Sequence, residues 1–247
     1  MSDALHNRSD RELQDALIAY LSDANLRRAP APALPLSAGQ ALRAGKFARF
    51  LARRYYRDRL ARSFRFSRRF APPAESIVDA PEFDAFLEDC VLGSLSAAER
   101  VGELAIAHLL PAAAPGVWWN DLLEYERLFF LQAATMEHAE PAQPPSASAS
   151  ARCRNFAWRM PDLLRGLKAG ALPADNLRGQ TILLFSRSRH GRIYVAEVDE
   201  STAAVFRAAQ VQLSPPEIAA TALLPAATVR QVLAGLAQVG ALSSSLE

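Results

Sequence analysis

The sequence predicts an α+β fold, in which an N-terminal all-helical domain precedes a small winged-helix-like domain made of a β-hairpin or three strands and three helices. Two observations predict it. Up to residue 138, apolar residues recur every three or four positions, which is the period of an amphipathic helix. After residue 151, alternating apolar and polar residues predict a hairpin, and three short helical patterns follow it. We therefore divide the 247 residues into a helical domain at 1–138, a linker at 139–151 and a second domain at 152–245.

The helical domain is expected to contain several helices separated by prolines and short turns. The longest pattern, residues 37–70, is one helix or two helices broken near Ser63, and Pro72 and Pro73 end it. Ser96 is the expected N-cap of a later helix, with Glu99 completing a capping box. The expected helices cover residues 10–23, 37–70, 81–92, 97–110 and 118–138.

The second domain is expected to begin after a linker that contains three prolines and no large apolar residue. Its hairpin turns through Arg189, His190 and Gly191, and Gly240 is the expected C-cap of the last helix. The expected strands are residues 153–158, 181–186 and 192–198, and the expected helices are 160–169, 201–209, 215–223 and 226–239.

Positive charge is concentrated in one segment, although the net charge of the chain is only +2. Residues 43–69 hold eleven basic residues and one acid, Asp58, with aromatic residues interleaved. Such a segment would attract phosphate, but interleaved aromatic residues fit a packed helix, and arginine is favoured at protein interfaces. We therefore favour a protein partner, or acids of the same chain, over nucleic acid. The candidate partner-interface residues are Tyr55, Arg57, Arg65 and Arg68.

The sequence contains no recognisable catalytic or metal-binding pattern. Glu124 and Glu126 lie two apart on a helix and point in different directions, so at most one faces a cleft. We expect a structural role, in which one of them pairs with arginines of the basic segment. The four histidines have no ligand spacing, and we expect no catalytic residue, metal or cofactor in this chain. These histidines are His6, His108, His138 and His190.

The composition indicates a soluble cytoplasmic protein. No apolar run reaches the ~18 residues that a membrane span requires, and the first ten residues lack the apolar core of a signal peptide. Two cysteines, Cys90 and Cys153, are too few for a disulfide framework and are expected to be reduced.

The last two helical patterns have the spacing of a helix-turn-helix. The second begins with Ala226 and Ala227 rather than with the donors and cations that would read DNA. The module is better suited to an extended peptide that adds a strand to the hairpin edge and packs against the last helix. The sequence does not decide which face of the hairpin is open. The candidate peptide-binding residues are Arg192, Tyr194, Val195, Ala196, Val198, Arg230 and Leu233.

Two resemblances bear on function. The hairpin followed by VFRAAQVQLSPPEIAATALLPAATVRQVLAGLAQVGAL resembles the peptide-recognition element of ribosomal natural-product pathways. The segments RYYRDRLARSFRFSRRF, PEFDAFLEDCVLGSLSAAERVGELAIAHLL and WWNDLLEYERLFF resemble the methanobactin-biosynthesis protein C family, which includes the partner protein of 3-thiaglutamate synthesis. Together the resemblances cover most of residues 40–242, and residues 140–179 match least.

The resemblance implies a non-catalytic subunit that pairs with a TIM-barrel protein carrying a multinuclear iron site. The heterodimer would oxidise a cysteine of a precursor peptide, to an oxazolone and thioamide in the methanobactin case, and this chain would hold the leader of that peptide. The iron ligands would belong to the partner. A winged-helix nucleic-acid-binding regulator with a basic helical arm is the alternative, and steep salt dependence of binding would distinguish it.

Overall fold

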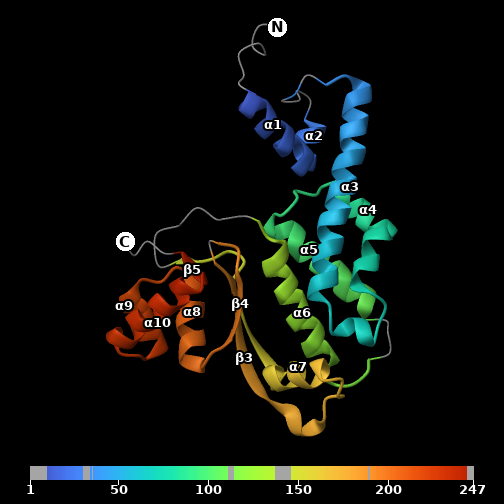
Figure 1. Ribbon diagram of the computed structural model, residues 1–247. Helices are drawn as coiled ribbons and strands as arrows, with labels where there is room; N and C mark the ends of the chain where they lie inside the picture. The colour runs from blue at the N-terminus through green and yellow to red at the C-terminus, as the bar shows by residue number, and fades with distance from the viewer. Residues whose placement is uncertain are drawn as a thin grey trace.

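The computed structural model describes residues 10–29, 34, 36–110, 114–136, 146–188 and 190–243. It has the predicted α+β class, with an N-terminal helical region followed by a three-stranded antiparallel sheet and three further helices (Figure 1). The predicted turn residue Arg189 and His138 at the end of a predicted helix lie outside the described residues.

The N-terminal helices form an arm that stands away from the rest of the molecule (Figure 1). Ser37 and Gln40 make a reciprocal capping box at the start of the long helix α3, because the side chain of each accepts from the backbone N–H of the other. The helix ends at Ser63, which decides between the two alternatives for the basic segment in favour of a break near that residue. The arm elements are α1 (Asp10–Ser22), α2 (Ala24–Arg28) and the first half of α3 (Ala38–Ser63).

The remaining helices of this region surround the second half of α3. The predicted cap of α5 is corrected: the hydroxyl of Ser94, not Ser96, accepts from the backbone N–H of Ala97. The predicted helix 81–92 ends early, because Ala24 N–H donates to Cys90 O and the backbone at Val91 bridges to Asp23. The elements are η2 (Ser67–Arg69), η3 (Ala74–Asp79), α4 (Pro81–Leu87), α5 (Leu95–Leu109) and α6 (Trp119–Ala134).

The three-stranded sheet has the order β2-β3-β4 and separates two hydrophobic cores. Phe156 and Phe185 point from one face into the core of the helical region, where α6 covers the sheet (Figure 1). Leu184 points from the opposite face into a second core formed with the last three helices. The elements are β2 (Arg152–Trp158), α7 (Met160–Lys168), η4 (Asp175–Leu177), β3 (Arg178–Arg187) and β4 (Ile193–Glu197).

The last helices follow the sheet in the predicted order. Gly240 adopts a φ of +75° just after α10, as expected for a residue that ends a helix. The elements are α8 (Glu200–Gln210), α9 (Pro215–Ala222), α10 (Ala226–Gln238), β1 (Ser146–Ala147) and β5 (Leu242–Ser243).

The expected linker is only partly a linker. Ser146 and Ala147 form β1, which pairs antiparallel with β5, and Ala151 is buried in the second core. Residues 139–145 lie outside the described residues. Because the core of the helical region continues into β2, α7 and β3, the two predicted domains share one hydrophobic core.

Candidate functional site

The outer strand of the sheet, β4, presents an open edge. On one side β4 pairs antiparallel with β3, in a register that places Phe185 opposite Val195 and Arg187 opposite Ile193. Among the described residues, no second strand pairs with the other side of β4. An unpaired strand edge carries a row of backbone donors and acceptors that another chain can satisfy.

The hydrogen bonds at the two ends of the hairpin show which backbone groups face outward. Val198 N–H donates to Ile182 O at 3.0 Å, and Ser188 N–H donates to Arg192 O at 2.9 Å. In an antiparallel ladder, residues that bond inward alternate with residues that bond outward. Tyr194 and Ala196 therefore bond to β3. The N–H and C=O groups of the intervening residues point away from the sheet, and these are the groups of Ile193, Val195 and Glu197.

The side chains of β4 point to both faces of the sheet. Val195 packs against the core that faces α6. Tyr194 lies opposite Ser186, and Ala196 lies opposite Leu184, so both point toward the last three helices. All β4 residues except Glu197 are half-buried, so the side chains beside this edge are mainly apolar.

The end of the hairpin is held between two helix C-termini. The Ser186 hydroxyl donates to Val239 O at the end of α10, at 2.8 Å. The guanidinium of Arg187 donates to Gln132 O and Thr135 O at the end of α6, where a cation is favoured by the unpaired carbonyls. A side chain at Gly240 would bring its Cβ within 2.4 Å of Arg187 O. These contacts fix the orientation of the open edge relative to both cores.

The predicted peptide-binding residues divide into two groups. Arg192, Tyr194, Val195, Ala196 and Val198 lie on or beside β4, with the Arg192 guanidinium 5.1 Å from the centre of the Tyr194 ring. On α10, Leu233 is enclosed in the second core and Arg230 is exposed. A peptide added to β4 would therefore meet Leu233 only after rearrangement of the core.

The predicted partner-interface residues all make contacts within the chain. The Tyr55 hydroxyl donates to Ala134 O at 2.8 Å. Arg57 forms an ion pair with Asp79 at 2.5 Å, and Arg68 forms one with Glu75 at 3.3 Å. Of the three predicted arginines, only Arg65 forms no ion pair with a described residue, and its guanidinium lies 4.7 Å from the centre of the Phe66 ring.

Sequence reasoning missed how regularly α3 is paired with the elements beside it. Arg49, Arg53 and Arg57 lie four residues apart and pair with acids of the segment that runs from the end of η3 to just past α4. Their respective partners are Glu88, Asp84 and Asp79. The matching antiparallel spacing of bases and acids is the signal that could have revealed these pairs.

Contrary to prediction, no ion pair among the described residues joins the α6 glutamates to arginines of the basic segment. Glu124 pairs with Arg127 of its own helix and with Arg154 of β2. Glu126 is fully buried and accepts from the backbone N–H groups of Phe66, at 2.6 Å, and Ser67. Burial raises the pKa of Glu126 to about 7, although these hydrogen bonds act in the opposite direction. The carboxyl group therefore holds the turn after α3 rather than facing a cleft.

The cysteines are not activated nucleophiles. Burial raises the pKa of the Cys90 thiol to about 11 and also raises that of Cys153, so both are protonated near neutral pH. In the part of the chain that the structure describes, no three histidine, cysteine or carboxylate side chains come together as a metal site. His6 and His138 lie outside that part.

Within the described ranges, no single helix has the length and apolarity that crossing a membrane requires. Helices α9 and α10 reach that length and apolarity only as a pair, which is bent by 111°.

Two comparisons with known proteins identify no family for this chain. No protein-family model matches the chain, and no curated protein matches it with significant similarity.

Proposed function

We propose that this chain binds a ribosomally made precursor peptide by adding an extended segment of it as a strand beside β4. We further propose that it acts as the non-catalytic, substrate-recognising subunit of a heterodimeric oxidase that modifies a cysteine of that peptide. In this proposal the multinuclear iron site belongs to a TIM-barrel partner subunit, as the resemblance to the methanobactin-biosynthesis protein C family implies.

The observation that carries the peptide-binding proposal is the open edge of β4. Three residues, Ile193, Val195 and Glu197, direct backbone donors and acceptors outward within a half-buried, mainly apolar strand. Strand addition uses such groups for affinity and uses pockets beside alternate side chains for specificity. Tyr194 and Val195 lie on opposite faces of the sheet, so a bound strand would meet a different surface on each face.

The charge distribution supports a protein or peptide ligand over nucleic acid. Four arginines along α3 and η2 are already matched by carboxylates of η3 and α4 or of the residue after α4. The start of α10 carries alanines and a threonine, not a row of cations. Phosphate recognition depends on unmatched cations and weakens steeply with salt, whereas strand addition does not.

The test compares two proline variants on neighbouring residues of β4. Val195→Pro removes an outward N–H and places a ring where the added strand would lie, and edge strands tolerate proline at such positions. We expect this variant to fold and to bind a fluorescent leader peptide at least about tenfold more weakly, because one hydrogen bond is worth about 1 kcal/mol and the ring adds a steric barrier. Ala196→Pro is the control, because it removes an inward bond to β3 and should lower the melting temperature.

A second measurement keeps the proposal testable if the proline variant fails to fold. Leader peptides N-methylated at alternate residues are titrated into the wild-type chain. N-methylation of the residues whose N–H groups point toward β4 should abolish binding. N-methylation of the alternate residues, whose N–H groups point away from β4, should not. Unchanged affinity for both peptide sets, or for Val195→Pro, would refute strand addition at this edge.

A further inference from the structure

The arm carries an unusual amount of exposed apolar surface. Among the described residues up to residue 50, only Tyr20, Ala24, Leu34 and Ala48 are buried. A cleft of about 250 Å³ lies between α3 and the pair α1 and α2. The exposed large apolar residues of the arm are Leu13, Leu17, Ile18, Leu26, Leu42, Phe47 and Phe50. The arm thus has little hydrophobic core of its own, and most of its large apolar side chains are exposed, as in a surface that another protein covers.

One face of α3 combines this apolar surface with charge. Arg43, Phe47, Phe50 and Arg54 follow one another at intervals of four, three and four residues, which places them on one face of the helix. Phe47 and Phe50 are 51% and 55% exposed, and their rings stack with centres 6.4 Å apart. The buried residues Ala48, Ala52 and Tyr56 lie on a different face. We call the set Arg43, Phe47, Phe50 and Arg54 the arm face.

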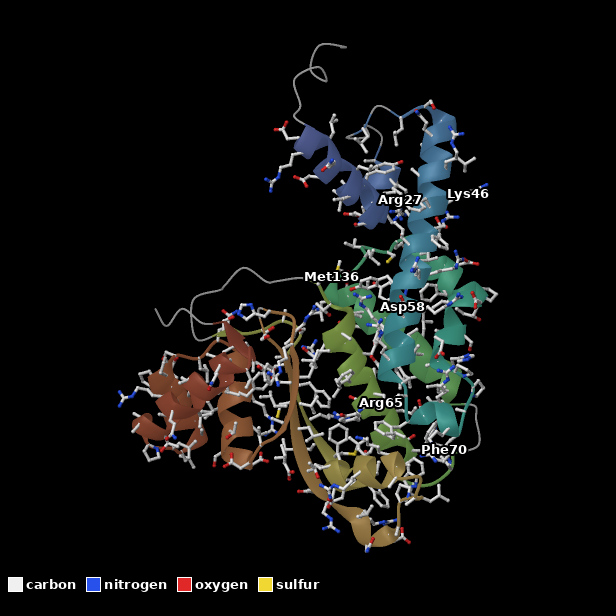
Figure 2. All side chains as sticks on the ribbon, viewed as in Figure 1. Arg27, Lys46, Asp58, Arg65, Phe70 and Met136 are labelled. Carbon is white, nitrogen blue, oxygen red and sulfur yellow. The ribbon has the colours of Figure 1, made fainter. Side chains whose placement is uncertain are left out.

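The cations of the arm face differ from three other arginines of α3. Arg49, Arg53 and Arg57 each pair with a carboxylate. Arg43 and Arg54 are exposed and have no ion pair among the described residues. Lys46 of α3 (Figure 2) lines the cleft between α3 and the pair α1 and α2, is exposed, and also lacks an ion pair in the described ranges. Positive charge is therefore left unmatched where the exposed phenylalanines lie.

We propose that the arm face docks the second subunit of the complex, through an apolar segment of that subunit bordered by carboxylates. This inference rests on the proposed function for the existence of that subunit, and on the arm face for the place and chemistry of the contact. Stacked aromatic residues form the centre of many protein interfaces, and charged residues at the rim select the partner and speed association. The predicted interface residues around Arg57 and Arg68 are satisfied within the chain, whereas the arm face is not.

A polyanion fits this surface less well than a protein does. Nucleic acid or an anionic membrane would be attracted by Arg43 and Arg54, but α1 in the same arm exposes Glu12 and Asp15. The exposed apolar residues of α1, Leu13, Leu17 and Ile18, would gain nothing from the phosphates of nucleic acid. An apolar protein segment can cover these side chains.

The experiment co-expresses the full chain with the iron-binding TIM-barrel subunit and measures their affinity after purification. The double variant Phe47→Glu and Phe50→Glu should weaken the complex at least about 30-fold, the effect of losing an interface hot spot. Arg43→Glu with Arg54→Glu should slow association, and most strongly at low salt. Leu172→Glu and Val211→Glu are matched controls, because these side chains are 69% and 68% exposed outside the arm. Circular dichroism should show that every variant is folded.

The same variants are titrated with the fluorescent leader peptide, which separates this inference from the proposed function. Normal peptide binding together with loss of the iron subunit supports docking at the arm face. A complex that survives both arm variants overturns docking there and leaves peptide binding at β4 standing. If the wild-type chain binds no iron subunit, the two-subunit proposal itself fails.

Two further outcomes would replace the proposed occupant. The first is self-association of the chain alone, measured by sedimentation. If the chain self-associates and Phe47→Glu with Phe50→Glu abolishes this, a second copy of the chain is the partner. Binding of a DNA duplex or of anionic vesicles that Arg43→Glu with Arg54→Glu abolishes would identify a polyanion instead.

Discussion

Glu126 makes the stability of this protein depend on pH in a direction opposite to that of most carboxylates. Its side chain is buried on α6, and it accepts backbone N–H groups of Phe66 and Ser67, just after α3. Burial disfavours the charged form and raises the pKa to about 7, from an ordinary value of 4.5. Replacement of Glu126 by glutamine keeps the shape of the side chain and one acceptor but removes the titration.

The sign and size of the effect follow from the two pKa values. Below about pH 4.5 the carboxyl group is protonated in both the folded and the unfolded state. Between 4.5 and about 7 the unfolded chain releases the proton while the folded chain retains it, so the free energy of unfolding falls as pH rises. At about 1.4 kcal/mol per pH unit, the loss is about 3 kcal/mol once the pH exceeds 7.

Urea unfolding of the wild type and of Glu126→Gln at pH 5, 6, 7 and 8 measures this loss. The free energy of unfolding of the wild type should fall by about 2.5 kcal/mol relative to the variant over that range, because part of the loss has already occurred at pH 5. Groups that titrate in both proteins cancel in the difference. A difference that does not change with pH, or that grows in favour of the wild type as pH rises, would refute the account of the buried carboxyl group.

Three further substitutions test how the hairpin and α5 are held. Gly240→Ala should destabilise the protein by about 2 kcal/mol or more, because φ is +75° and the new Cβ would meet Arg187 O. Gly235→Ala should instead stabilise the protein by up to about 1 kcal/mol, because Gly235 lies in α10 with open space around it. Thermal melts would compare the two variants. Arg187→Met should speed hydrogen exchange in β3 and β4, since the hydrogen bonds of Arg187 to the end of α6 are lost. Unchanged exchange would contradict the role of these bonds in holding the hairpin. Ser94→Ala should cost about 1 kcal/mol in chemical unfolding and Ser96→Ala less than about 0.5, and the reverse order would restore Ser96 as the cap.

The places where sequence reasoning failed share a physical cause. Helix α4 ends at Leu87 because the backbone of Cys90 is used by Ala24 of a distant helix. Ser146 belongs to a strand because it pairs with Ser243, almost one hundred residues later. Such pairings leave no periodic trace in the local sequence. The pairing of Glu126 with backbone N–H groups was likewise missed, because a backbone donor has no sequence signal.

The sequence by itself determined the α+β class, the order of the longer helices and of the three strands of the sheet, and Ser63 as the place where the basic helix could break. These features depend on side-chain period and on prolines, which act over a few residues. Only the tertiary structure decided which cations are matched by carboxylates, that both predicted domains share a core, and that Val195 directs its backbone groups outward. Each of these depends on which distant segment lies alongside, and chain packing, not local preference, sets that neighbour.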